Sequence, residues 1–257
     1  MEQDIAETKE ENKPEINAIN DQNMRPNKNN QSQIAGAIII AGLIVAGAIL
    51  IKGNGMGSVK DLTKASPIFN QCLDSGKYAQ AIADSKNVGA IAGVTGTPKG
   101  FILSNGKVVA TIDGAEPAAT VKQKIDAALA GTSKTIDSIQ LAPVTNSDFI
   151  LGGGNGAKVT IVEYSDFQCP FCGKFFKEAE QTVINNYIKS GEVNLVYRDF
   201  AFLGPESLKS AEAARCAGEQ NKFWEYHDYL FNHQMGENQG AFADPKLKSF
   251  AAELKLK

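Results

Sequence analysis

Two cysteines three positions apart, Cys169 and Cys172, constrain the fold of this chain more than any other feature. They lie in VEYSDFQCPFCGKFF, where an apolar stretch typical of a buried strand leads directly into a helical pattern. Pro170 suits the first turn of that helix. The free N–H groups and positive dipole end at a helix start stabilise a thiolate. We therefore expect Cys169 to have a lowered pKa and to act as a nucleophile.

A CxxC pair serves redox chemistry, binds zinc or forms a structural disulfide. A zinc site would need a second cysteine pair or suitably spaced histidines, and His227 and His233 lack that spacing. We predict a redox pair, with no metal and no cofactor. Cys172 lies one helical turn after Cys169 and would close a disulfide with it by thiol–disulfide exchange.

The N-terminal part of the chain differs sharply from the rest. Residues 1–33 are rich in Asn, Gln, Glu and Lys and cannot bury enough apolar surface to fold, so we predict a disordered tail. Residues 34–51, IAGAIIIAGLIVAGAILI, carry no charge and as a helix would span roughly 27 Å, close to a bilayer core. The alternative, a cleaved signal peptide, conflicts with the long acidic tail and the length of the run. We predict a transmembrane anchor, with a linker at residues 52–64.

The remaining sequence alternates between helical and strand patterns. An Asn-Gly pair between two short apolar stretches predicts a β-hairpin, and a Ser-Pro pair predicts a helix start. The segment 131–157 is rich in Ser, Thr, Gly and Asn and predicts a linker or a loosely attached edge. The expected helices are 66–75, 77–86, 117–130 and 169–189, followed by one from about residue 206, one near 221–232 and one from 244 to the C-terminus. The expected strands are 101–103, 108–112, 159–164 and 193–197.

These segments together resemble thioredoxin-fold thiol-disulfide oxidoreductases of the DsbA type. VTIVEYSDFQCPFCGKFF followed by VNLVYRDF resembles the first half of that domain, and AEAARCAGEQNKFWEYHDYLF resembles its helical insertion. GVTGTPKGFILSNGKVVATIDGAEPAATVKQKIDAALAG resembles its second half. The resemblance covers nearly all of residues 65–257. It implies an α/β, thioredoxin-like fold with a helical insertion, preceded here by one transmembrane helix.

The resemblance also assigns roles to individual residues. Thr97 and Pro98 match the cis-proline loop, which lies against the CxxC pair and pairs with substrate backbone; a trans proline at a strand start is the alternative. Glu163 matches the buried acid that exchanges a proton with Cys172, and an exposed strand residue is the alternative.

Four further residues complete the candidate site. Pro170 and Phe171 lie between the two cysteines and would contact substrate. Phe171 departs from the Cys-Pro-His-Cys form, so we expect a less extreme oxidant. Cys72 and Cys216 fall in predicted helices, where they form either a structural disulfide or two buried free thiols.

The two halves occur in the opposite order from the family. Residues 65–130 resemble the C-terminal half and residues 158–257 the N-terminal half, which predicts a circular permutation within the helical insertion. The linker 131–157 reaches at most roughly 90 Å, more than a small domain requires. A truncated tandem or a swapped dimer, in which two chains complement each other, are the alternatives.

We predict a membrane-anchored protein-disulfide oxidoreductase that oxidises protein thiol substrates and is reoxidised by a membrane redox partner. The domain would be extracytoplasmic, at the surface of a bacterial cell membrane, with the N-terminal tail cytoplasmic. The formal net charge of −3 argues against a nucleic-acid partner. The alternatives are a disulfide reductase or isomerase of the same fold, or a non-catalytic binding or structural module whose halves do not assemble.

Overall fold

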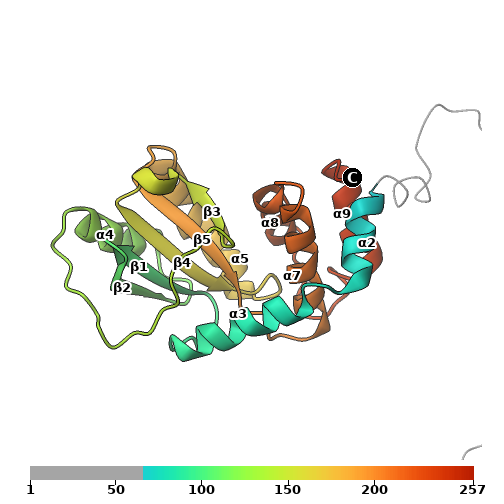
Figure 1. Ribbon diagram of the computed structural model, residues 1–257, viewed down its shortest axis with the longest axis horizontal. Coiled ribbons are helices and arrows are strands. Elements are labelled where there is room, and N and C mark those ends of the chain that lie inside the picture. The colour runs from blue at the N-terminus through green and yellow to red at the C-terminus, as the bar shows by residue number, and fades with distance from the viewer. Residues whose placement is uncertain (1–65) are drawn as a thin grey trace, which may run out of the picture. The chain divides into compact units, whose positions relative to one another are not determined.

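The computed structural model describes residues 66–257 (Figure 1). The predicted tail, transmembrane anchor and first linker, residues 1–64, lie outside the described residues. Within residues 66–257, no helix has both the length and the apolar character that a membrane span needs.

A five-stranded mixed sheet forms the centre of the fold, with strand order β2-β1-β4-β5-β3. The central pair β4 and β5 is parallel, and the other neighbouring pairs are antiparallel. Nearly every residue of β4 and β5 is buried, as expected for strands covered on both faces. The strands are β1 Lys99–Ser104, β2 Lys107–Asp113, β3 Phe149–Gly152, β4 Val159–Ser165 and β5 Val193–Asp199.

The predicted hairpin is confirmed. Asn105 and Gly106 both have positive φ, 51° and 75°, which is the backbone conformation of a tight two-residue hairpin turn. The hairpin then pairs with a strand distant in sequence, since Gly100 and Phe101 of β1 lie opposite Glu163 and Val162 of β4. One chain therefore supplies both segments to a single sheet.

Helices cover the sheet and form a second group beside it. α4 and the long helical stretch that begins with α5 pack on one face, around Ile102, Ile125 and Ile161. α2, α7, α8 and α9 group beside the sheet (Figure 1) around a separate aromatic core. The helices are α2 Pro67–Ser75, α3 Ala79–Ile91, α4 Ala118–Leu129, α5 Pro170–Phe175, α6 Gln181–Val183, α7 Pro205–Gly218, α8 Phe223–Asn232 and α9 Asp244–Glu253; π-helical segments η2 Phe176–Glu180 and η3 Ile184–Ile188 continue α5 and α6, and η1 Gly154–Gly156 is a short 3-10 turn.

The C-terminal residues contact the first described helix. The backbone N–H of Phe69 donates to the carbonyl of Lys257 at 2.7 Å, and the Ser66 hydroxyl donates to the carbonyl of Leu256 at 2.8 Å. α2 and α9 lie side by side in Figure 1. Segments at opposite ends of the described chain thus form one helical group.

The segment 131–157 packs on the sheet and contributes one of its strands. Ile136, Ile139, Leu141 and Val144 pack on the sheet face opposite α4, and the end of the segment forms β3. The Ser, Thr, Gly and Asn content masked this spaced apolar set, which is why the sequence predicted a linker or loose edge.

Arg198 of β5 fixes the segment 131–157 to the sheet. Its guanidinium donates to both carboxylate oxygens of Asp148, at 2.8 and 3.1 Å. It also donates to the carbonyls of Ala142 at 3.0 Å and Pro143 at 2.9 Å. A forked donor of this kind holds a chain segment in one orientation.

One helix boundary was predicted wrongly. α3 continues to Ile91, beyond the predicted end at residue 86, because Gly89 lets the helix pack on Tyr164: a Cβ at Gly89 would lie 2.8 Å from that ring.

Candidate active site

The CxxC pair lies where β4 passes into α5. Cys169 is the residue at which the helix begins, and its carbonyl accepts the backbone N–H of Gly173 at 3.0 Å. Both cysteines are free thiols and both are buried, Cys169 to 5% and Cys172 to 0% exposure. Phe171 between them is 62% exposed. The motif therefore presents an apolar ring to solvent and leaves only a narrow approach to sulfur.

The loop before β1 closes over Cys169. The Thr97–Pro98 peptide is cis, as the family resemblance implied, and Pro98 is buried. The thiol of Cys169 donates to the carbonyl of Thr97, with a sulfur to oxygen distance of 3.4 Å. Thr97 and Cys169 are 72 residues apart and meet within one chain.

The pKa values of the two thiols are shifted in opposite directions. The pKa of Cys169 is lowered to about 6, mainly by the hydrogen bond from Cys172. The Thr97 side chain and the backbone N–H groups of Cys172 and Phe171 also lower this pKa, whereas burial opposes the shift. Burial raises the pKa of Cys172 well above its ordinary value, and the neighbouring Cys169 raises it further. Near neutral pH the pair therefore carries one negative charge, and this charge resides on the Cys169 sulfur.

Glu163 lies on β4, the strand that leads into the CxxC motif, and is 2% exposed. Burial is the main cause that raises its pKa to about 7; a hydrogen bond with Ser165 opposes the rise, and the negative charge of Cys169 adds to it. Its Oε2 has no hydrogen-bond partner within residues 66–257. A carboxyl in this setting can gain or lose a proton near neutral pH, as a proton carrier must.

Asp166 holds the loop that carries Cys169, and the sequence analysis missed it. Its buried carboxylate accepts the backbone N–H groups of Gln168 at 2.9 Å, Phe202 at 2.9 Å and Leu203 at 3.2 Å, and the Ser207 hydroxyl at 2.7 Å. The bond to Gln168 is a short-range Asx turn that the local sequence could have suggested. The other three partners come from distant residues.

Gln234 supports the same loop from the helical group. Its side-chain amide donates to the carbonyls of Phe167 at 2.6 Å and Cys169 at 3.1 Å. A Cβ at Gly173 would lie 2.0 Å from the Gln234 oxygen, so only glycine leaves room for this contact. No sequence signal identifies Gln234, since it follows α8 in an irregular segment.

The remaining predicted residues lie at two places. Pro170 is exposed next to Phe171 at the start of α5. Cys72 and Cys216 form a disulfide that joins α2 to α7, with 5.8 Å between their Cα atoms. They belong to the aromatic core of the helical group.

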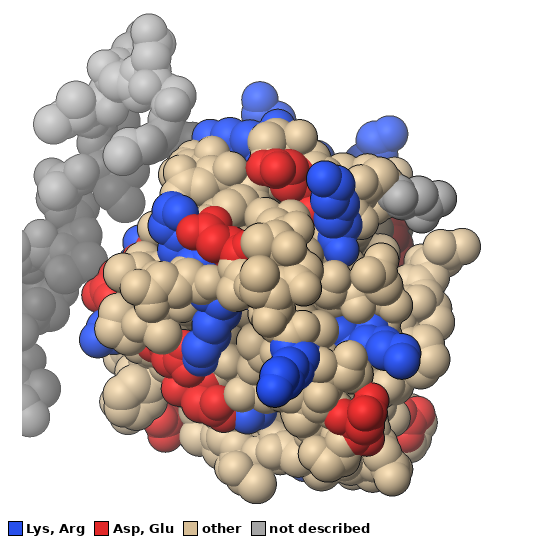
Figure 2. Space-filling view, turned by 90° about the vertical axis from the view of Figure 1, so that its left-hand side faces the viewer, with Lys and Arg blue, Asp and Glu red and all other residues tan. Residues whose placement is uncertain are grey.

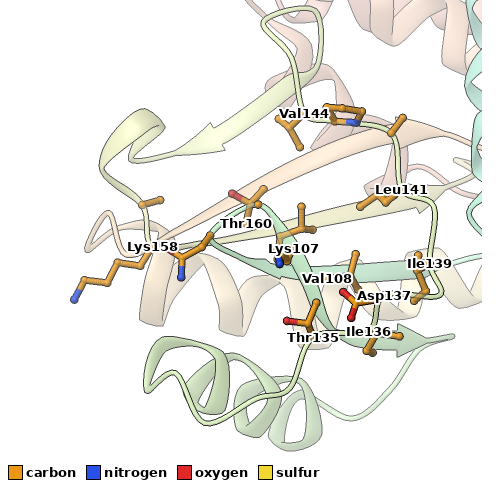
Figure 3. Close-up of a pocket in the computed structure, with 16 residues that line it drawn as sticks. Lys107, Val108, Thr135, Ile136, Asp137, Ile139, Leu141, Val144, Lys158 and Thr160 are labelled. Atoms are coloured by element: carbon orange, nitrogen blue, oxygen red, sulfur yellow. The ribbon is translucent and has the colours of Figure 1, made fainter.

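One pocket among the described residues lies away from the cysteines. It has a volume of about 730 Å³ and lies between the β1–β2 hairpin and the segment 135–144 (Figure 3). None of its lining residues comes from the CxxC pair or the cis-proline loop. Among residues 66–257, one group of side chains could hold a metal ion: Glu180, His227 and Asp228.

Comparison with known proteins agrees with this geometry. Residues 145–256 match the family model described as Thioredoxin. This part of the chain is similar to the thioredoxin family. Disulfide bond formation protein D of Bacillus subtilis is 27% identical over 110 residues, which are 42% of this chain and 49% of that protein. The resemblance to DsbA-type oxidoreductases is confirmed.

Another relative has a different name. The Na(+)/H(+) antiporter NhaA 3 of Salinispora tropica is 38% identical over 109 residues, 42% of this chain but 16% of the antiporter. This chain spans less than half the length of either relative. The crystal structure of Wolbachia pipientis alpha-DsbA1 aligns with a TM-score of 0.40 at 23% identity, over 44% of this chain and 57% of that one.

Proposed function

We propose that this protein is a thiol-disulfide oxidoreductase that oxidises dithiols in protein substrates. The observation that carries the proposal is the position of Cys169: a buried thiol of low pKa at a helix start, hydrogen-bonded to the cis-proline loop. Low pKa makes a cysteine both a good leaving group and a stable thiolate. The alternative of an idle, non-catalytic module has less support, because β1 and β4 pair within one sheet.

The reaction starts from the oxidised Cys169–Cys172 disulfide. A substrate thiolate attacks Cys169 Sγ, the bond between the two cysteines breaks, and Cys172 leaves and takes up a proton. Glu163 is the donor for that proton. A second substrate thiolate then attacks the substrate sulfur of the mixed disulfide and releases Cys169 as a thiolate. The substrate loses two electrons and the CxxC pair gains them.

The oxidising direction follows from the stability of the reduced pair. An environment that stabilises the Cys169 thiolate favours the dithiol over the disulfide, so the disulfide tends to accept electrons. Phe171 in place of histidine makes this tendency weaker than in the Cys-Pro-His-Cys form. A reduction potential measured against glutathione separates an oxidase from a reductase or isomerase: a value as low as that of thioredoxin, about −270 mV, would contradict the oxidising direction.

Substrate recognition is proposed to combine backbone pairing with apolar contact. Thr97 and Pro98 line a hollow of about 290 Å³, and the carbonyl of Thr97 contacts the Cys169 thiol. Phe171, Phe202 and Met235 are all large exposed apolar side chains, and each lies on a segment that supports or contains the motif. These exposed apolar side chains suit an unfolded polypeptide as substrate. The face in Figure 2 carries interspersed basic and acidic side chains, without the basic patch that a nucleic-acid partner would require.

We also propose that the domain is circularly permuted. Residues 256–257 contact residues 66–69, so a chain in the family order could pass from α9 into α2. A chain rebuilt with residues 131–257 ahead of residues 66–130, which keeps β3 and the Arg198–Asp148 pair, should fold to the same five-stranded sheet and keep activity. Failure to fold would favour a swapped dimer or a tandem origin.

Membrane anchoring rests on the sequence of residues 34–51. The proposed arrangement is a single span in a cell membrane, with the domain extracytoplasmic, the tail cytoplasmic and a membrane redox partner that reoxidises the CxxC pair. The Cys72–Cys216 disulfide suits an oxidising compartment. Deletion of residues 1–51 should move the protein from the membrane to the soluble fraction; a deleted form that stays with the membrane would contradict the anchor.

The test of function is stoichiometric oxidation of a reduced dithiol peptide by the full-length oxidised protein in detergent. The wild type should oxidise about one peptide per chain, and Cys169→Ser should leave only the background rate. A double variant, Cys72→Ser with Cys216→Ser, is the control, since it removes the other two cysteines of the chain but retains the CxxC pair. Oxidation by Cys169→Ser at the wild-type rate would refute the proposal.

A further inference from the structure

Glu180 is a buried carboxyl that the proposed redox reaction does not use. It lies in η2, the π-helical segment that follows the CxxC helix, and is 1% exposed. Neither of its carboxyl oxygens has a hydrogen-bond partner within residues 66–257. A polar group taken out of water without a partner is costly, so such a group calls for an explanation. π-helical segments are often found at functional sites.

His227 of α8 offers a second unpartnered atom. Its side chain is fully buried, and its Nδ1 lies 2.9 Å from Asp228 Oδ1. When the proton is on Nε2, which has no partner among the described residues, the lone pair of Nδ1 faces the Asp228 carboxylate, and a cation between the two could be bound by both. Six aromatic rings surround the imidazole, with ring centroids at most 6.1 Å from the centroid of the imidazole: Phe167, Phe176, Tyr197, Phe223, Trp224 and Phe231.

Three potential ligands therefore converge at one place. One ligand atom from each of Glu180, His227 and Asp228 lies within 4.8 Å of the other two. Donor atoms that share a tetrahedral zinc ion lie about 3.4 Å apart, so small side-chain rotations would close the site. Two carboxylates and a neutral imidazole sum to a charge of −2, which a divalent cation neutralises. Asp228 is 52% exposed and gives the ion a way in from solvent.

We propose that Glu180, His227 and Asp228 bind one divalent transition-metal ion, with zinc as the best match and a water molecule as the fourth ligand. An imidazole nitrogen with carboxylate oxygens suits zinc, whereas calcium and magnesium prefer all-oxygen sites. The ion would join the helical stretch that carries the CxxC pair to α8 of the helical group. It would also satisfy the buried oxygens of Glu180, which no protein group does.

Without an ion, burial and the neighbouring charges would set the protonation of these groups. Burial raises the pKa of Glu180 well above its ordinary value, and nearby Glu163 and Asp228 raise it further. Burial lowers the pKa of His227. The competing account is therefore a neutral acid beside a neutral imidazole, with no affinity for metal, and the two accounts differ in a measurable way.

The test is zinc binding to the full-length chain in which Cys169 and Cys172 are both serine, so that thiolates cannot contribute. Calorimetry should give about one zinc ion per chain. Asp228→Asn, at a half-exposed position that should not disturb folding, should weaken binding at least tenfold. Glu180→Gln should do the same and lose the zinc-dependent rise in melting temperature.

Two controls locate the ion. Glu225→Gln removes an exposed carboxylate three positions before Asp228 on α8, and His233→Gln removes the other histidine of the chain. Both should bind zinc as the parent does. The proposal is overturned if the parent binds no zinc, or if Glu180→Gln and Asp228→Asn bind it as tightly as the controls. Because these proteins lack the CxxC pair, the result is independent of the redox proposal.

Discussion

At the scale of single residues, two identical side chains acquire different chemistry from their positions. Cys169 receives hydrogen bonds at a helix start, whereas Cys172 is enclosed in the core. The sequence predicted this difference, because position relative to a helix start can be read from the Cys-Pro-x-Cys order. The family resemblance placed the loop with Thr97 against the CxxC pair, but the effect of Thr97 on the Cys169 pKa could not be read from the sequence.

Alkylation of the reduced protein by iodoacetamide should report the Cys169 pKa. The rate should rise with pH with a midpoint near 6, since the thiolate is the reactive form. Cys172→Ala removes the main hydrogen bond and should move the midpoint upward, toward the pKa of an ordinary thiol. A midpoint near 8.5 in the wild type would contradict the described geometry.

Glu163→Gln should slow the exchange step by about 100-fold, the low end for loss of a general acid. The rate profile of the wild type should inflect near pH 7, the pKa of Glu163, and this inflection should be absent in the variant. An unchanged profile would assign the proton transfer to another group.

The same variant should be more stable than wild type at pH 8. An acid whose folded pKa is raised to about 7 favours the folded state below its unfolded pKa, and this stabilisation is lost as pH rises to about 7. Urea unfolding at pH 5 and pH 8 separates the effect on catalysis from the effect on stability.

At the scale of elements, the sequence was most informative where a local pattern decides the structure. The β1–β2 hairpin, the CxxC helix and α7 to α9 were all expected near their observed bounds. The failures involve distant contacts. α3 runs through Gly89 because of Tyr164, and residues 136–144 are packed because of the sheet beneath them. Neither partner is adjacent in sequence.

The Arg198–Asp148 pair should contribute strongly to the attachment of this segment. Their side chains are only 9% and 12% exposed, so loss of one charge leaves the other buried and unpaired. We expect Asp148→Asn to lower the free energy of unfolding by about 3 kcal/mol. Asp137→Asn, at an exposed position in the same segment, is the matched control and should change it by less than about 0.5 kcal/mol. Equal losses of unfolding free energy for the two variants in urea would contradict a stabilising role for the Arg198–Asp148 pair.

At the scale of the whole molecule, the order of the two halves ceases to be an obstacle. β1 from the first half pairs with β4 from the second, and the cis-proline loop meets Cys169 in the same chain. The supports at Asp166 and Gln234 draw on both the sheet and the helical group. Sequence patterns predicted the individual helices and strands, and the family resemblance predicted how the two halves combine. The contacts from Asp166 and Gln234 that hold the Cys169 loop were found only in the structure.

The most direct test is to trap the reaction intermediate. Reduced Cys172→Ser protein lacks the resolving thiol, so its Cys169 thiolate should attack a peptide disulfide and remain bound to it. Mass spectrometry of the monomeric fraction should find one peptide per chain, attached at Cys169. No adduct, or an adduct at Cys72 or Cys216, would contradict the assignment of Cys169 as the reactive cysteine, and an adduct confined to a dimer would contradict a site completed by one chain.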